Sequence, residues 1–255
     1  MNEKMVRAAW VSANLFGYEL LREAIKVEDF EISVIFTLSG SSPTKMFDSV
    51  DLSKWYEFGI PVHEITDINE ELDMIRSYSP EIIIMCGWRQ IIKKDLLDLP
   101  KRGMIGFHPT LLPKGRGPAP IINTILEGFQ ESGVSMYYLS EGLDDGDIIG
   151  QEIFTVGPDD YAHDIYERVT QCGKQLVRTY IPMLVQEFAP RVPQDNRNAT
   201  YLLKRTMADN KIDLDVDSID IIYRKIRAFS KPYMGAFIIK NNKKLIIWNA
   251  EISEE

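Results

Sequence analysis

Three short apolar runs alternate with amphipathic segments in the first ninety residues of this 255-residue chain. The runs lie at residues 5–11, 32–38 and 81–87, and the stretch YELLREAIKV between the first two has helical spacing. This alternation predicts parallel strands joined by helices, and the run EIIIMCG predicts a strand covered on both faces. We therefore expect an α/β fold with a doubly wound, Rossmann-like and mostly parallel sheet.

The remainder of the chain extends this pattern and then changes character. Further strands are predicted at 61–65, 103–108, 133–140 and 148–156, and helices at 52–58, 68–78, 91–99, 120–129 and 161–188. Residues 189–202, rich in proline and polar residues, are typical of a linker. Beyond them we expect a helix at 216–229 and a hairpin at 235–252 that turns at Asn241–Asn242. Residues 191–255 would then form a small α+β extension ending in a hairpin, packed on a first domain of residues 1–190.

Composition excludes several classes of protein. The net charge of −9 disfavours a broad nucleic-acid surface, because an acidic protein repels phosphate backbones. No apolar run approaches the roughly 20 residues that span a bilayer, and the first residues do not resemble a signal peptide. Cys86 and Cys172 are the only cysteines, which fits a reducing compartment. We expect a cytoplasmic protein that binds neither nucleic acid nor membrane.

Two common kinds of site are disfavoured. The sequence SANLFGYELL after the first predicted strand lacks the glycine fingerprint of dinucleotide-binding folds. The three histidines and two cysteines show no metal-ligand spacing, so no metal is expected. His63 and His163 are more typical of structural histidines.

His108 differs because it ends a predicted strand directly before a stiff loop. That loop holds three prolines and two glycines within residues 109–118. Fixed φ angles make such a loop rigid while its backbone donors stay open to a ligand. A second cluster, EGLDDGDIIGQ at 141–151, carries four acidic residues. It could be a solvated turn or a calcium loop, but it lacks the downstream glutamate of an EF-hand. An aspartate there could instead orient an imidazole or accept a proton.

Together these strings resemble a known family. GFHPTLLPKGRGPAPIINTILEG (106–128) and SGVSMYYLSEGLDDGDIIGQEI (132–153) closely resemble the 10-formyltetrahydrofolate-dependent formyltransferases. In that family a strand ends in Asn-x-His-Pro, and a SLLP-like loop and a distant Asp-x-Gly follow. His108-Pro109, the LLP at 111–113 and the DDG at 144–146 match in order. KRTMADNKIDL and IRAFSKPYMGAFIIKNNKKLIIWNA resemble the C-terminal segment of sugar-modifying and tRNA-modifying members.

The resemblance implies an activity and its residues. Residues 1–190 would be a catalytic domain that moves a formyl group from 10-formyltetrahydrofolate, a co-substrate, to a primary amine. His108 and Asp144 would be catalytic. The folate would be bound by Met85, Gly87, Trp88, Ile91, Ile92, Leu139 and Gly142. The amine substrate would be bound by Asn14, Lys114, Arg116 and Gly117.

One position departs from the family pattern. The asparagine expected two residues before the histidine is Gly106 here. An asparagine amide would stabilise the oxyanion that forms when the amine attacks, and losing one such donor raises the barrier by roughly 2.7–4 kcal/mol. Three alternatives follow: another group supplies the donor, the activity is low, or the chain has lost this reaction.

The amine is expected to belong to a nucleotide-linked sugar. We expect a UDP- or dTDP-linked 4-amino-4,6-dideoxy sugar, as in pathways resembling that of pseudaminic acid. A tRNA substrate is less favoured, because the net charge is −9 and the chain ends soon after the hairpin. The alternatives are a methionyl-tRNA formyltransferase-like enzyme, a formyltetrahydrofolate hydrolase and a non-catalytic folate-binding module. A homodimer is compatible with each.

Overall fold

A seven-stranded sheet forms the centre of the computed structural model, which describes residues 5–44 and 46–253. Its strand order is β3-β2-β1-β4-β5-β6-β7. The strands are β1 (Val6–Val11), β2 (Phe30–Leu38), β3 (Val62–Ile65), β4 (Ile82–Cys86), β5 (Met104–His108), β6 (Glu131–Tyr138) and β7 (Ile148–Thr155). Neighbours among β1 to β5 pair in parallel, whereas β6 and β7 add an antiparallel edge. The predicted α/β class and mostly parallel sheet are confirmed.

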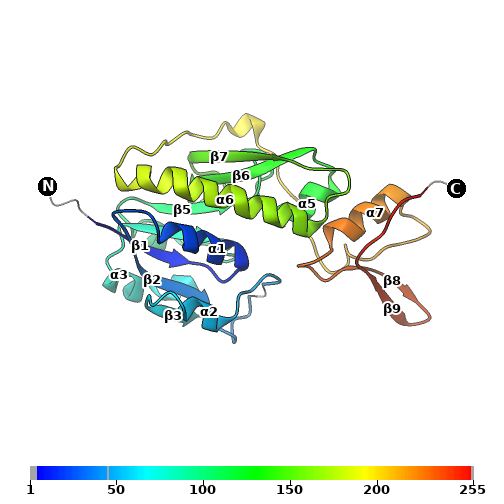
Figure 1. Ribbon diagram of the computed structural model, residues 1–255, viewed down its shortest axis with the longest axis horizontal. Helices are drawn as coiled ribbons and strands as arrows, with labels where there is room; N and C mark the ends of the chain where they lie inside the picture. The colour runs from blue at the N-terminus through cyan, green and yellow to red at the C-terminus, as the bar shows by residue number, and fades with distance from the viewer. Residues whose placement is uncertain (1–4, 45, 254–255) are drawn as a thin grey trace.

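Helices cover both faces of this sheet (Figure 1). They are α1 (Leu15–Ala24), α2 (Leu52–Tyr56), α3 (Leu72–Ser77), α4 (Lys94–Leu97), α5 (Pro120–Leu126), α6 (Ala162–Val185) and, in the C-terminal part, α7 (Ile219–Ala228). Two 3₁₀ helices lie at Ile68–Glu70 and Asn196–Asn198. The long helix α6 packs beside α1 and crosses β6 and β7.

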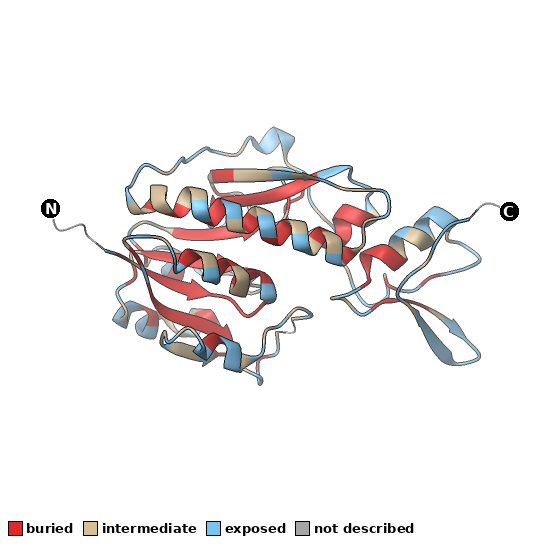
Figure 2. Ribbon diagram, viewed as in Figure 1, coloured by how far each residue is buried: buried red, intermediate tan, exposed pale blue. Residues whose placement is uncertain are grey.

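The core explains why the central strands are continuously apolar. Along β1, Ala8 and Trp10 belong to a cluster on the face of α1 and α6, whereas Ala9 and Val11 belong to a second cluster on the opposite face. Successive side chains of a strand point to opposite faces, so a sheet buried on both sides needs apolar residues at every position. Figure 2 shows the central strands buried along their length.

The C-terminal part is small and lies beside one end of the sheet (Figure 1). It consists of α7 and a two-stranded hairpin, β8 (Ala236–Lys240) and β9 (Lys243–Ile247). Asn241 and Asn242 have φ angles of 50° and 57°, so both turn residues are left-handed, as a tight hairpin turn requires. The predicted hairpin and its turn are confirmed. The hydroxyl of Tyr161, just before α6, bonds both the carbonyl and the amide of Ala250 at 3.0 and 3.1 Å.

Three segments differ from the sequence prediction. The helix expected at 68–78 is divided into the 3₁₀ helix Ile68–Glu70 and α3. The helix expected at 91–99 is limited to α4, because the Asn69 side chain donates to the carbonyl of Ile91 and accepts from the amide of Lys93. These bonds replace the ones that a longer helix would make. The expected linker at 189–202 is held against the first domain, where Val192 pairs with Ile148 and Tyr201 pairs with Arg116.

The topology places one edge of the sheet for ligand binding. After β1 the chain builds β2 and β3 on one side, and β4 and β5 then lie on the other side. The loops after β1 and β4 therefore diverge, which leaves a crevice at the carboxyl ends of these strands. Asn14, Gly87 and His108 lie at or just beyond the ends of β1, β4 and β5.

Candidate active site

A cleft of about 710 Å³ lies at this edge of the sheet. Loops after β1, β4, β5 and β6 line it, together with α5, α6 and Tyr233 of the C-terminal part. The volume is in the range of small-molecule sites. Of the expected site residues, the lining contains Asn14, Met85, Gly87, Trp88, Ile91, Ile92, His108, Gly117, Leu139, Gly142 and Asp144. Lys114 and Arg116 are not part of it.

His108 is held at the end of β5 with a defined orientation. Its Nε2 lies 2.7 Å from the carbonyl oxygen of Gly115. A carbonyl only accepts hydrogen bonds, so Nε2 carries a proton and donates it. The other ring nitrogen, Nδ1, is then the atom that can take up or release a proton.

Asp144 faces that second nitrogen. Its Oδ2 lies 3.7 Å from His108 Nδ1, although 36 positions separate the two residues in the sequence. The side chains are only 8% and 18% exposed, so little water screens the contact. The distance is too long for a direct hydrogen bond, but such bonds often tighten only when substrate is bound.

Two donors fix the Asp144 carboxylate. The backbone amide of Gly117 donates to Oδ2 at 2.8 Å, and the hydroxyl of Tyr137 donates to Oδ1 at 2.7 Å. Burial and the adjacent charge of Asp144 raise the pKa of Tyr137 well above its usual value, so its hydroxyl stays protonated and remains a donor. No sequence motif points to Tyr137. Only the pairing of β5 with β6 brings it opposite Gly106, next to the His108 strand end.

Arg116, expected beside the amine substrate, is buried outside the cleft lining. It is 2% exposed, and its guanidinium donates to Gln194, Asn196 and Tyr201. Gln194 in turn donates to the carbonyls of Asp144 and Gly146 at 2.9 and 2.7 Å. Arg116 therefore helps to hold the loop that carries Asp144, through its hydrogen bonds to Gln194. Lys114 is exposed outside the cleft.

The expected folate residues form an apolar wall. Met85, Trp88, Ile92 and Leu139 pack on one buried cluster of the sheet and also line the cleft. Gly87 has a φ of +60°, and a Cβ there would lie 2.2 Å from Asn14 Nδ2, so the strand end approaches the loop after β1 closely. An apolar wall of this kind can pack against the ring system of a small ligand.

Asn14 belongs to a polar cluster at another part of the cleft. Its Oδ1 caps α1 through the amide of Gly17, and its Nδ2 donates to Asp48 Oδ2 at 3.0 Å. The hydroxyl of Tyr166 donates to the same Asp48 oxygen at 2.6 Å. The loop between β2 and α2 thus reaches the cleft through Asp48, a residue that no sequence motif marks.

Cations and aromatic rings also line the cleft. Arg89 stacks over the ring of Phe47 at 5.5 Å, and Phe47 meets Tyr233 edge to face at 6.2 Å. Lys204 and Arg205 come from the segment before α7. Arg205 is engaged with Asn123 and Glu127 at 2.7 Å each, and Lys204 is exposed.

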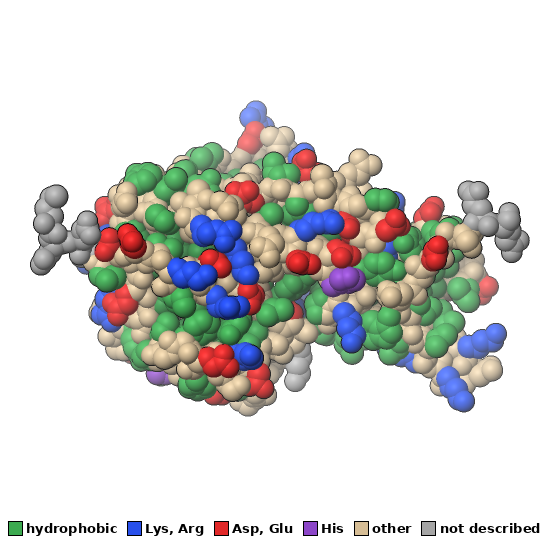
Figure 3. Space-filling view, in the orientation of Figure 1, with side chains coloured by type: hydrophobic (Ala, Val, Ile, Leu, Met, Phe, Trp, Pro, Cys, Tyr) green, Lys and Arg blue, Asp and Glu red, His purple; other side chains and the backbone are tan. Residues whose placement is uncertain are grey.

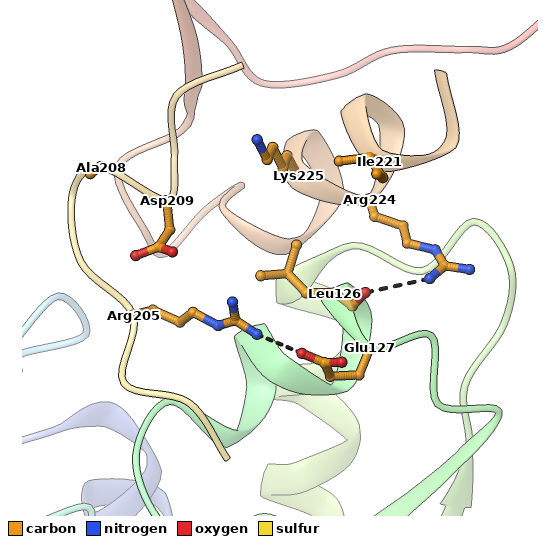
Figure 4. A pocket seen from close by; sticks show the side chains of 8 residues that line it. All are labelled: Leu126, Glu127, Arg205, Ala208, Asp209, Ile221, Arg224 and Lys225. Carbon is orange, nitrogen blue, oxygen red and sulfur yellow. Dashed lines mark hydrogen bonds and ion pairs between the residues drawn. The ribbon is translucent and has the colours of Figure 1, made fainter. Parts of the chain in front are cut away.

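A second cavity of about 430 Å³ lies between α5 and α7 (Figure 4). Arg205 pairs with Glu127 across it, and Arg224 reaches the carbonyl of Leu126 at 3.4 Å. Lys225, also in its lining, bonds Asp217 at 2.6 Å. The bonds of Arg205 and Arg224 join the C-terminal part to the first domain, whereas the bond of Lys225 lies within the C-terminal part.

Neither a metal centre nor a membrane span is found in the described part of the chain. Within residues 5–44 and 46–253, no three histidine, cysteine or acidic side chains come together as a metal site. Over the same residues, no helix has both the length and the apolar character needed to cross a bilayer.

Two regions of the chain match the two domains of one protein family. Residues 58–181 match the formyl transferase domain, and residues 204–255 match the formyl transferase C-terminal domain. The chain belongs to the formyl transferase family. The resemblance seen in its motifs is thereby confirmed.

The chain is similar to curated relatives and to solved structures of different names. A methionyl-tRNA formyltransferase of Moorella thermoacetica is 31% identical over 77% of this chain, which spans only 63% of that protein. A 4-N formyltransferase from Francisella tularensis shares the fold with a TM-score of 0.77 and 20% identity, over 98% of this chain and 99% of that one. A sugar N-formyltransferase from Shewanella sp. FDAARGOS_354 has a TM-score of 0.76 at 19% identity, over 98% and 100% of the two chains.

Proposed function

We propose that this protein transfers a formyl group from 10-formyltetrahydrofolate to the primary amine of a UDP- or dTDP-linked 4-amino-4,6-dideoxy sugar. The observation that carries the proposal is the buried His108–Asp144 pair, with Nδ1 and Oδ2 3.7 Å apart in the wall of the cleft. The apolar wall of Met85, Trp88, Ile92 and Leu139 would hold the pterin beside the His108–Asp144 pair.

The proposed chemistry follows from this pair. As the amine nitrogen bonds to the formyl carbon, His108 Nδ1 accepts the proton that leaves the amine, and Asp144 stabilises the resulting imidazolium. The imidazolium donates a hydrogen bond to the oxyanion on the former carbonyl. When the bond from that carbon to the folate nitrogen breaks, His108 returns the proton to that nitrogen. Holding both substrates in one cleft supplies the proximity.

Charge supports a sugar nucleotide over tRNA. A net charge of −9 opposes a polyanion, whereas one diphosphate needs only a local cation. The sugar N-formyltransferase from Shewanella aligns with this chain from end to end, but this likeness concerns the fold alone. The methionyl-tRNA relatives have the higher sequence identity, so Met-tRNA is the second candidate.

The diphosphate needs a cation other than Arg116. Arg116 is buried and already bonded to three side chains. Lys204 is exposed and lines the cleft, and we assign it to the diphosphate. Asn14 and Gly117 stay proposed as residues beside the sugar.

The deciding experiment measures tetrahydrofolate release with each acceptor. Purified protein is incubated with 10-formyltetrahydrofolate and UDP-amino sugar, dTDP-amino sugar, Met-tRNA or no acceptor. Release that depends on an amino sugar, with a formylated product by mass spectrometry, supports the proposal. Release with Met-tRNA alone would identify the second candidate, release without acceptor would identify a hydrolase, and no release would leave a binding protein.

Two variants test the assigned roles. We expect His108→Ala or Asp144→Asn to lower kcat about 10²- to 10⁴-fold while the melting temperature stays close to that of the wild type. The matched controls are His163→Ala, an exposed histidine at the start of α6, and Asp145→Asn, the next carboxylate along the chain. Both controls should keep wild-type kcat. Equal activity of His108→Ala and wild type would remove His108 from the mechanism.

A further inference from the structure

Gly106 and Tyr137 are cross-strand partners at the centre of the site. Gly106 on β5 lies directly opposite Tyr137 on the antiparallel strand β6, two residues before His108. A Cβ at position 106 would lie 2.6 Å from Cδ2 of Leu139, and 3.1 and 3.3 Å from Cε1 and Cζ of the Tyr137 ring. A side chain at position 106 would have to displace the end of the Leu139 side chain, and the Tyr137 ring would have to give way by a few tenths of an ångström. The Leu139 side chain and the Tyr137 ring together border the space beside Gly106.

The same ring brings a donor to that space. The Tyr137 hydroxyl is bonded to Cζ, the atom 3.3 Å from the missing Cβ, and it donates to Asp144 Oδ1 at 2.7 Å. Tyr137 is 4% exposed and lines the cleft. The polar group that β5 lacks at position 106 is thus present on the neighbouring strand.

We propose that Tyr137 is a positioning residue for formyl transfer, which holds the Asp144 carboxylate facing His108 from the space left by Gly106. The inference rests on the proposed function and adds a residue to it.

The contacts of Asp144 show how this positioning works. The amide of Gly117 bonds only Oδ2, the oxygen that faces His108, so by itself it leaves the carboxylate free to pivot. The bond from Tyr137 to Oδ1 adds a second fixed point and sets the plane of the carboxylate. Gln194 holds the backbone carbonyl of Asp144 but does not touch the carboxylate. Tyr137 is therefore the one described side chain that donates a hydrogen bond to this carboxylate.

Tyr137→Phe removes the donor and keeps the ring. We expect kcat to fall about 10- to 100-fold, as expected for the loss of one hydrogen bond to a charged group, while KM for each substrate changes less than about threefold. The matched control is Tyr138→Phe, the next residue, whose ring lies under Arg191 at 4.1 Å and outside the cleft lining. It should keep wild-type kcat. If Tyr137→Phe does not fold, Tyr137→Met also lacks the hydroxyl and can fill the space with a flexible side chain.

A double-mutant cycle separates positioning from a general structural role. Because Tyr137 acts through Asp144, Tyr137→Phe should lower kcat less than about twofold when added to Asp144→Asn. Two fully additive effects, or wild-type kcat in Tyr137→Phe, would overturn the inference. These outcomes are distinct from failure of the proposed function, which would appear first as wild-type protein that forms no formylated sugar.

Discussion

Arg116 and Gln194 join the loop after β5 to the segment that follows α6. The guanidinium of Arg116 donates hydrogen bonds to the side chains of Gln194, Asn196 and Tyr201. The side-chain amide of Gln194 in turn donates to the backbone carbonyls of Asp144 and Gly146. These three partners of Arg116 are uncharged side chains, so neutral oxygens satisfy the buried guanidinium. The position of Asp144 thus depends on residues fifty and more positions later in the sequence.

Replacing Arg116 tests this dependence. We expect Arg116→Met to lower the free energy of unfolding by about 3 kcal/mol, because buried hydrogen bonds to a charged group are lost together. It should also lower kcat, since the Asp144 loop loses its brace. Urea denaturation and steady-state kinetics measure the two effects. Arg191→Met is the matched control, because that side chain is 62% exposed and should change stability by no more than about 1 kcal/mol.

At the residue scale, the motifs single out His108 and Asp144, whose side chains lie 3.7 Å apart, but they do not indicate what surrounds the two residues. The family pattern names the pair, but only His108 is placed at this edge of the sheet by the end of a parallel strand, β5. The partners of Arg116 and the approach of Tyr137 to Gly106 depend on long-range packing and strand register. Neither feature produces a periodic pattern in the local sequence. For this reason the sequence suggests a substrate contact for Arg116, which is buried outside the cleft, and gives no sign of the contact between Tyr137 and Asp144.

Among the elements, the strands were predicted most closely. Continuous apolar runs identify β1, β2 and β4 because both faces of the sheet are covered. The helix expected at 91–99 was wrong in length, since Asn69 binds the backbone at 91 and 93 from another segment. Residues 189–202 have the composition of a linker, yet hydrogen bonds to the first domain hold them. Composition indicates how readily a segment can be solvated, whereas its contacts depend on what the fold brings near.

Ion pairs between α1 and α6 form a charged seam, and their contribution to stability should depend on pH. Figure 3 shows basic side chains gathered over these two helices, with acidic ones between them. Lys174 bonds Glu19 at 2.5 Å, and Arg178 lies 3.5 Å from Glu23. Burial raises the pKa of Glu19, but the hydrogen bond and charge of Lys174 outweigh it and hold this pKa below its usual value of 4.5. The seam therefore contributes stability above about pH 4.5 and loses it as the pH falls through the lower, folded-state value.

Lys174→Met should show this pH dependence. At pH 7 we expect the variant to be less stable than wild type by up to about 1 kcal/mol, and at pH 3 the difference should shrink because Glu19 is becoming protonated in both proteins. Urea denaturation at the two pH values measures it. Lys26→Met, whose side chain is 64% exposed, is the control and should show a smaller difference at both. A stability difference that widens at pH 3 would contradict the lowered pKa of Glu19.

On the scale of the whole molecule, the C-terminal part and the first domain share one core. Ile226, Ala228 and Phe229 are buried in the same apolar cluster as Trp10, Ile105 and Leu176. The C-terminal part also supplies Tyr233 to the cleft, so its docking completes the candidate site. A part of this size buries too little apolar surface to fold alone. We therefore expect the two parts to unfold together, although the family regions match them separately.

Phe229→Ala tests whether the molecule unfolds as one unit. Phe229 is 2% exposed at the end of α7, and its truncation should lower stability by about 3–5 kcal/mol through lost burial and a cavity. Because the core is shared, scanning calorimetry should give a single transition at lower temperature, coincident with loss of the far-UV circular dichroism signal. Phe188→Ala, 58% exposed, is the matched control and should shift stability by no more than about 0.5 kcal/mol. An early, separate transition in Phe229→Ala would instead mean that the C-terminal part melts off a first domain that is stable without it, and that the cleft can lose Tyr233 while the His108–Asp144 pair stays folded.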